Sequence, residues 1–205
     1  MKKIYLIRHG ETDWNRQMRF QGRKDIPLNE NGKNQARLLS NYLSSENFAA
    51  ISASPLSRAW ETAKIIAGKH NLTPKAAEGL MEMHFGNWEG KIYKEMNETD
   101  RRVMEKWFSD PVSNHIPGGE SLKEFQKRIQ HHYDLLLDNY PAGNLAVITH
   151  GGAIKIVVAG ILEIPLSKIS RLRLVTASLT VILYDSWGNP YLELFNGTGH
   201  LQLNH

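Results

Sequence analysis

The chain has 205 residues, 41% hydrophobic content, no cysteine and a formal net charge of +4. This length and apolar content suffice for one sizeable core, so we expect a single domain over residues 1–205 without disulfides. The lysines and arginines are dispersed and no apolar run is long enough to span a bilayer, which argues against nucleic-acid and membrane partners.

The first predicted element is an apolar, β-favouring run at residues 3–7, which stops at Arg8 and His9. A nearly continuous hydrophobic strand is typical of a parallel sheet that is buried on both faces. In open α/β sheets, ligands bind at the carboxyl ends of the strands. The sequence therefore places Arg8 and His9 at the expected ligand-binding edge.

Arg58 follows a second short strand that ends at Ala53. Ser54-Pro55 predicts a helix N-cap followed by proline at the first helical position, and Gly68 predicts the end of that helix. Arg58 would then project from the first helical turn, where free N–H groups and the helix dipole favour an anion. Taken alone, Arg58 could equally be a solvated arginine paired with Glu61.

A third buried strand, residues 145–149, ends at His150, and residues 153–159 predict a helix closed by Gly160. His9 and His150 thus occupy equivalent positions after two strands, and each is followed by a glycine that permits close approach of a ligand. A single histidine at such a turn would be unremarkable in itself, whereas the pair indicates a site.

Alternation of strands and helices predicts a three-layer α/β/α sandwich with a mostly parallel sheet. Residues 177–184 and 191–195 flank a turn-rich segment and predict a hairpin, so at least one strand should run antiparallel. Leu122, Phe125 and Ile129 begin an apolar helical stripe that we interpret as structural.

Taken together, the motifs resemble the signature of the histidine phosphatase superfamily, in its phosphoglycerate-mutase-like branch. The matching strings, from residue 4 to about residue 185, are Arg8-His9-Gly10-Glu11-Thr12-Asp13-Trp14-Asn15, Phe20-Gln21-Gly22, Asp25-Ile26-Pro27-Leu28, Gly32, Gln35-Ala36, Ser54-Pro55-Leu56-Ser57-Arg58-Ala59, Glu61-Thr62-Ala63, Glu82 with Phe85-Gly86-Asn87-Trp88-Glu89-Gly90, Pro117-Gly118-Gly119-Glu120-Ser121 and Thr149-His150-Gly151-Gly152. A lone Arg-His-Gly string carries little information, but the ordered set is specific. The resemblance implies one histidine phosphatase catalytic domain, with residues 91–119 as a variable cover over the site.

The resemblance also assigns roles. His9 would be the nucleophile that forms a phosphohistidine. Arg8 and Arg58, with His150, would bind and neutralise the phosphoryl oxygens. Glu82 would act first as general acid and then as general base; without its flanking motif it would look like an ordinary exposed glutamate. The remaining phosphate-binding positions are Asn15, Gln21, Gly22 and the N–H of Gly151.

Rival functions have less support in the sequence. A His-Glu-x-x-His motif, a Walker A loop and a Gly-x-Gly-x-x-Gly motif are all missing, so we expect neither a metal nor another cofactor. The predicted class is a metal-independent histidine acid-type phosphatase. A phosphoglycerate mutase-type phosphotransferase is the alternative, although mutases usually carry a longer insertion than the 67 residues between Glu82 and His150. A non-catalytic phosphate-binding module ranks lower, because every matched catalytic position is filled.

The sequence narrows the substrate only to a small-molecule phosphomonoester, such as alpha-ribazole 5′-phosphate or a broad range of phosphomonoesters. Apolar residues in the cover, at 93, 96, 103, 104, 107 and 108, could line a substrate pocket or simply pack onto the core. Arg19, Arg23 and Lys24 could steer anions, and we expect them to be solvated. The default expectations are a cytoplasmic location and, if the chain associates, a symmetric homodimer.

Overall fold

The computed structural model, which describes residues 1–201, contains a six-stranded sheet in the order β3-β2-β4-β1-β5-β6. The strands are β1 (Lys2–Arg8), β2 (Phe48–Ala53), β3 (Lys75–Ala76), β4 (Asn144–Thr149), β5 (Leu179–Tyr184) and β6 (Pro190–Gly197). Strands β1 to β4 run parallel, while β5 pairs antiparallel with both β1 and β6. The predicted α/β class, with a mostly parallel sheet and an antiparallel hairpin, is confirmed.

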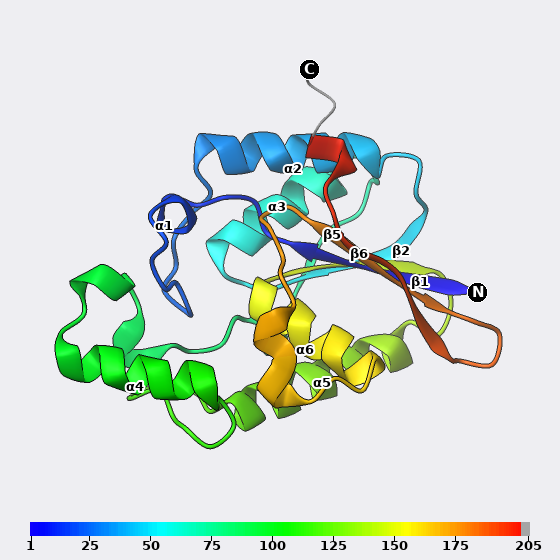
Figure 1. The fold of residues 1–205 in the computed structure, drawn as a ribbon. Helices are drawn as coiled ribbons and strands as arrows, with labels where there is room; N and C mark the ends of the chain where they lie inside the picture. Colours follow the sequence, from blue (N-terminus) through cyan, green and yellow to red (C-terminus); the bar gives the residue numbers. More distant parts are fainter. Residues whose placement is uncertain (202–205) are drawn as a thin grey trace.

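Helices cover both faces of the sheet (Figure 1). Helices α2 (Glu30–Tyr42) and α3 (Ser57–Ala67) lie on one face, and α5 (Leu122–Asn139) and α6 (Gly151–Ile161) lie on the other. The remaining helices are α1 (Asp13–Arg16), α4 (Glu98–Ser109) and the 3₁₀ turns η1 (Glu78–Leu80), η2 (Gly86–Trp88), η3 (Tyr93–Glu95), η4 (Leu166–Arg171) and η5 (Gly199–Leu201). Strand β1 supplies both cores by alternation: Tyr5 and Ile7 pack with the α2–α3 side, Ile4 and Leu6 with the α5–α6 side.

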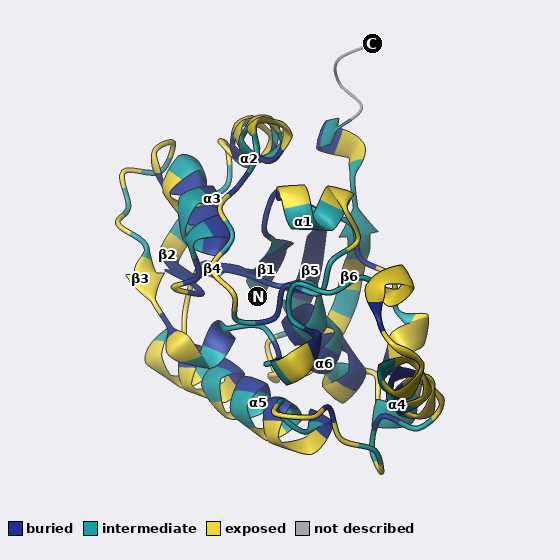
Figure 2. Cartoon of the chain, turned by 90° about the vertical axis from the view of Figure 1, so that its left-hand side faces the viewer, coloured by how far each residue is buried: buried dark blue, intermediate teal, exposed yellow. Residues whose placement is uncertain are grey.

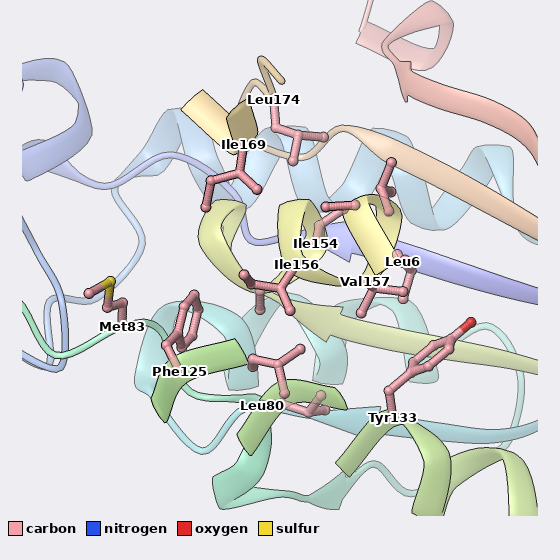
Figure 3. Packing of buried hydrophobic residues seen from close by; sticks show 14 of the residues in the cluster. Leu6, Leu80, Met83, Phe125, Tyr133, Ile154, Ile156, Val157, Ile169 and Leu174 are labelled. Atoms are coloured by element: carbon pink, nitrogen blue, oxygen red, sulfur yellow. The ribbon is translucent and has the colours of Figure 1, made fainter. Parts of the chain in front are cut away.

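Figure 3 shows the larger core, in which Leu6 and residues of α6 such as Ile154 and Val157 approach Tyr133 and Phe125 of α5. The apolar stripe of α5 is buried along its whole length, as expected of a structural helix. Burial of this kind contributes about 25 cal/mol per Å² of apolar surface and is the main force that holds the layers together.

Two predicted helix boundaries were wrong. Helix α3 has Leu56 as its N-cap, without a side-chain hydrogen bond, so Ser54 is not the cap. Helix α6 extends beyond Gly160 to Ile161. Packing explains the extension, because Ile161 still contacts the core and this contact outweighs the cost of about 1 kcal/mol of a helical glycine. Gly68 does follow the last residue of α3, as predicted.

The carboxyl ends of β1 and β4 meet at one edge, which Figure 2 views directly. Arg8 pairs in register with Thr149, and the N–H of His9 donates to the Thr149 carbonyl oxygen at 3.0 Å. His9 and His150 therefore leave neighbouring strands at the same level. Within residues 1–201, no helix has both the length and the apolar character that crossing a membrane requires.

Candidate active site

His9 is held in one tautomer. Its Nδ1 lies 2.7 Å from the carbonyl oxygen of Gly10, which can only accept, so Nδ1 carries the proton and Nε2 keeps a free lone pair. The ring is almost fully buried, at 3% exposure. Burial lowers the pKa of His9 well below its ordinary value, and the positive charges of Arg58 and Arg8 lower it further. The imidazole is therefore neutral and suited to nucleophilic attack.

His150 lies beside His9, with the two ring centroids 5.1 Å apart. Its Nε2 is 2.8 Å from the hydroxyl of Ser54, the residue that the sequence suggested as a helix cap. If the Ser54 hydroxyl donates this bond, Nδ1 of His150 carries a proton, and this buried Nδ1 has no partner among residues 1–201. Burial, then the charge of Arg58, lowers the pKa of His150 well below its ordinary value. In that tautomer the ring presents a neutral N–H donor at Nδ1.

The two arginines are fixed by backbone carbonyl oxygens. Arg58, at 1% exposure, donates to the carbonyls of Gly22 and Lys24 at 2.7 and 2.9 Å, and so does not pair with Glu61. Burial lowers the pKa of Arg58 to about 10, which leaves the guanidinium charged at neutral pH. Arg8 donates to the Leu174 carbonyl at 2.7 Å.

Three buried donors around His9 share one property. Arg8 Nε, Arg58 Nε and His150 Nδ1 have no hydrogen-bond partner within the described part of the chain. A buried donor without a partner costs about 1–3 kcal/mol, more when it is charged, so a ligand that satisfied these three at once would be bound favourably. Together, these donors form a set that a multiply charged oxyanion would satisfy.

Asn15 and Gln21 are oriented by a residue that sequence reasoning did not single out. The fully buried Thr12 lies with its Oγ1 3.0 Å from both Asn15 Oδ1 and Gln21 Oε1. The Thr12 N–H also donates to Asn15 Oδ1, at 3.1 Å. With both amide oxygens turned to Thr12, the two NH₂ groups remain as donors. Thr12 could have been recognised only as the N-cap of the short helix α1.

Glu82 lies in the loop between η1 and η2, against the start of α6. Its Oε2 accepts from the Gly152 N–H at 3.1 Å, and its Oε1 accepts from the Met83 N–H at 2.9 Å. A Cβ on Gly152 would overlap the Glu82 carboxylate, so only glycine leaves the carboxylate in this place. Gly151, whose N–H is predicted to bind phosphate, lies next to Arg8: a Cβ at Gly151 would be 3.5 Å from Arg8 Nε.

Arg128 of α5 holds the Glu82 loop and was missed by sequence reasoning. Its guanidinium donates to the carbonyl oxygens of Gly79, Met81 and Glu82, at 2.9 to 3.2 Å. It also forms two hydrogen bonds with the Glu120 carboxylate, at 2.9 and 2.8 Å. A planar guanidinium is suited to such a fork of acceptors, so Arg128 fixes the backbone that carries Glu82.

Glu89 joins the two loops that border the site. Its Oε1 accepts from the Arg23 N–H at 2.9 Å and from the Phe85 N–H at 3.1 Å. Gly22 has φ +54° and lies so close to the Glu89 carboxylate that a Cβ would overlap it. Glycine is therefore required twice at this position, for its conformation and for its close approach.

Glu82 and nine other residues line one cavity of about 170 Å³. These nine are Arg8, His9, Asn15, Arg19, Phe20, Gln21, Gly22, Arg58 and Phe85. We call this cavity the phosphate pocket. Arg19 was expected to be solvated, but it lines the pocket and donates to Glu95 and to the Gly90 carbonyl. Of the predicted set, His150 and Gly151 are not among the lining residues, although the His150 ring lies next to that of His9.

No group of three or more His, Cys, Asp or Glu side chains within residues 1–201 is placed to hold a metal ion. The chemistry that this arrangement can support is nucleophilic: a neutral imidazole with a free lone pair, several cationic or N–H donors, and a carboxyl group in the same cavity.

Comparisons with known proteins agree with this inventory. The family model described as "Histidine phosphatase superfamily (branch 1)" matches residues 4–197. Phosphoserine phosphatase 1 of Hydrogenobacter thermophilus is 32% identical over 201 residues, covering 98% of this chain and 95% of the relative. The protein named Probable phosphoglycerate mutase GpmB of Yersinia pestis is 32% identical over 210 residues, covering 99% and 96%.

Solved structures show the same architecture. YhfR of Bacillus stearothermophilus superposes with a TM-score of 0.92 at 30% identity, covering 98% of this chain and all of that one. A histidine-to-alanine variant of phosphoserine phosphatase from Entamoeba histolytica, in complex with phosphoserine, gives 0.84 at 34% identity, with 98% and 100% coverage. The alpha-ribazole phosphatase of Shigella flexneri gives 0.87 at 25% identity, with 95% and 96% coverage.

Proposed function

Since the chain belongs to branch 1 of the histidine phosphatase superfamily, we propose that it hydrolyses phosphomonoesters through a phosphohistidine at His9. The observation that carries the proposal is a group of buried nitrogens, on Arg8, Arg58 and His150, that have no partner among residues 1–201 and surround an imidazole whose Nε2 is free. Donors that are fixed before the substrate binds need no reorganisation when charge develops on the phosphoryl oxygens.

In the first step, the Nε2 lone pair of His9 forms a bond to phosphorus while the ester P–O bond breaks. The leaving oxygen takes the electron pair of that bond and a proton from the Glu82 carboxyl group. In the second step, the Glu82 carboxylate takes a proton from water, the water oxygen bonds to phosphorus, and the N–P bond returns its electron pair to Nε2. General acid and base catalysis of this kind is worth about 10²–10⁴ in rate.

The positions of Glu82 and the arginines support these roles. Glu82 lines the same cavity as His9, and its carboxylate is fixed by the Gly152 and Met83 N–H groups. Arg58 remains charged at neutral pH, and the NH₂ groups of Asn15 and Gln21 add neutral donors. The assignment requires no metal ion, so excess EDTA should leave the activity intact.

The substrate is proposed to be a small-molecule phosphomonoester. Relatives named as phosphoserine phosphatase and alpha-ribazole phosphatase support this class without selecting one compound. A panel containing phosphoserine, 3-phosphoglycerate and alpha-ribazole 5′-phosphate separates the alternatives. A kcat/KM ratio above about 10³ for one compound, or roughly 4 kcal/mol, would identify a dedicated enzyme, and a flat profile a generalist.

Phosphotransfer is the second candidate, because the similarity to GpmB extends over nearly the whole chain. The two reactions share the phosphohistidine and differ in whether water or a second hydroxyl group takes the phosphoryl group. Incubation with 3-phosphoglycerate distinguishes them: release of inorganic phosphate supports hydrolysis, and conversion to the 2-phospho isomer supports transfer.

The direct test of the proposed function compares His9→Ala with His131→Ala, an exposed histidine of α5, on para-nitrophenyl phosphate. His9→Ala should abolish turnover, while His131→Ala should retain it. Wild-type rates in His9→Ala would overturn the assignment. Phosphate binding by the wild-type protein without turnover would instead support a non-catalytic module.

A further inference from the structure

A second cavity, of about 180 Å³, shares Phe20, Glu82 and Phe85 with the phosphate pocket. The two shared phenylalanine rings meet edge to face, with centroids 5.3 Å apart. Glu82 is the residue proposed to protonate the leaving oxygen, so the part of the substrate that departs must lie next to it. The second cavity is therefore in place to receive the alcohol part of the ester, and we call it the leaving-group pocket.

The walls of the leaving-group pocket are mostly apolar and aromatic. Trp107 and Phe108, at the end of α4, meet edge to face with centroids 5.1 Å apart, and Pro111 follows them. Leu122 and Phe125 of α5 line the pocket as well. A dry cavity of about 150 Å³ is known to hold benzene, so this volume is enough for one ring. An apolar group of that size would gain free energy by leaving water here.

The cover segment thus has two functions. Its residues Met96 and Met104 are buried in the core at 2% exposure, whereas Trp107 and Phe108 face the leaving-group pocket. Trp107 does both, since it is also part of the hydrophobic core, whereas Phe108 is half exposed at the pocket. We assign the selection of the leaving group to Trp107 and Phe108.

Lys155 is the single cationic residue among those that line the leaving-group pocket within residues 1–201. It lies on α6, one turn after the glycines that follow His150, and it is half-buried. Its ammonium group makes no hydrogen bond or ion pair within residues 1–201. Burial lowers the pKa of Lys155, the charge of Glu82 opposes this shift, and the charge of Arg8 adds to it. A partly desolvated charge without a partner is costly, so an anion that entered this pocket would be bound favourably.

Resting on the proposed hydrolase function, we propose that the leaving-group pocket selects phosphomonoesters of a mostly apolar alcohol, about one ring in size, that carries a carboxylate or similar anion to pair with Lys155. The aromatic walls supply affinity for the ring, and the ammonium group of Lys155 distinguishes an anionic leaving group from a neutral one. Alpha-ribazole 5′-phosphate, whose alcohol part is larger and carries no anion, is then a poorer substrate than a small carboxylated ester.

A simpler role for Lys155 is to balance the charge of Glu82. That role would affect all substrates alike, whereas the proposed role affects only those with an anionic leaving group. A matched pair of esters separates the two roles, because para-carboxyphenyl phosphate and para-carbamoylphenyl phosphate have nearly the same shape and differ in one charge.

The experiment measures kcat/KM for both esters and compares their ratio within each enzyme. Wild type should favour the carboxylated ester by about tenfold or more, which corresponds to about 1.4 kcal/mol. Lys155→Met, of similar length and without the charge, should bring the ratio close to one, and Lys155→Arg should retain the preference. Lys64→Met, an exposed lysine of α3, makes the same change in net charge away from the pocket and should leave the ratio at its wild-type value.

A wild-type ratio near one, or a preference that survives Lys155→Met, would overturn this inference while the hydrolase function stood. Equal losses for both esters in Lys155→Met would assign Lys155 to balancing Glu82 and would also overturn it. If wild type hydrolysed para-nitrophenyl phosphate but neither of these esters, this inference alone would be overturned. Hydrolysis of none of the three would overturn the proposed function itself, so the two failures are distinguishable.

Discussion

Replacing Gly152 with alanine should separate the stability of this protein from its chemistry. Gly152 is the second residue of α6, and its φ lies outside the left-handed region, so the backbone accepts alanine. The added Cβ would lie 3.1 Å from Glu82 Cδ and closer than 3.0 Å to Oε1. The neighbouring Phe125 Cε1 is 3.2 Å away, which leaves the flexible Glu82 carboxylate as the group that must move.

The size of the expected effect follows from this geometry. Restoring ordinary contact requires a shift of the carboxylate by about 1 Å, and misplacement on that scale can cost about 10²-fold in rate, or roughly 2.7 kcal/mol. Alanine is also a better helix former than glycine, by up to about 1 kcal/mol. Gly152→Ala should therefore unfold no more easily than wild type while it loses activity.

The assay compares kcat/KM for para-nitrophenyl phosphate, whose leaving group departs without a proton, with kcat/KM for an alkyl phosphate, which needs the general acid. The alkyl ester should lose about 10²-fold and the nitrophenyl ester much less. Gly160→Ala is the matched control, since it makes the same change in α6 and approaches only the Gln130 amide nitrogen, at 3.2 Å. Equal losses for both esters, or none for either, would refute the role given to Glu82.

Three further predictions concern the charges around the site. Burial and the charge of Arg58 lower the pKa of His9, so kcat/KM should persist below pH 6.5, which is near the ordinary pKa of histidine. Arg58→Gln removes that charge and should move the acidic limb of the pH profile of kcat/KM to higher pH. An acidic limb that stayed in place would contradict the coupling between Arg58 and His9. His9 and His150 are both buried with lowered pKa values, so below about pH 6.5 the unfolded chain binds more protons than the folded chain. The free energy of unfolding, measured in urea, should therefore decrease as the pH is lowered from that value. A free energy of unfolding that stayed constant between about pH 7 and 5 would contradict this prediction. Arg128→Met should lower the free energy of unfolding by about 3 kcal/mol, because it removes the partner of the Glu120 carboxylate. It should also reduce activity most for substrates with poor leaving groups, because the backbone that carries Glu82 is no longer held. An unchanged free energy of unfolding in urea would argue against this role of Arg128.

The sequence predicted the parts of the site that depend on secondary structure. His9 and His150 follow buried strands, and the carboxyl ends of parallel strands gather at one edge of the sheet, so their proximity could be inferred before any coordinates. Arg58 in the first turn of a helix was predicted from a different signal, the helix start at Ser54-Pro55, although the residue at the N-cap was not predicted correctly. Strands and helices can be predicted from local sequence patterns, and so can the place of a residue at the end of a strand or in the first turn of a helix.

The remaining parts depend on contacts between residues far apart in the sequence, which no local pattern contains. Arg128 meets the Glu82 loop 46 residues away, and Glu89 meets Arg23 across 66 residues. Ser54 looked like a helix cap because its neighbours favour one, yet its hydroxyl lies next to His150, 96 residues away. Lys155 is an ordinary helical lysine in the sequence, and only the folded chain places it in a cavity.

The measurement that tests the account most directly is the capture of the phosphoenzyme. Wild type is mixed with a radiolabelled phosphomonoester, quenched in base, in which phosphohistidine survives, and mapped by peptide mass spectrometry, with His9→Ala and His131→Ala treated in parallel. We predict label on the peptide that contains His9 in wild type and in His131→Ala, and none in His9→Ala. Turnover without label on that peptide, or label that persists in His9→Ala, would contradict the nucleophilic role of His9.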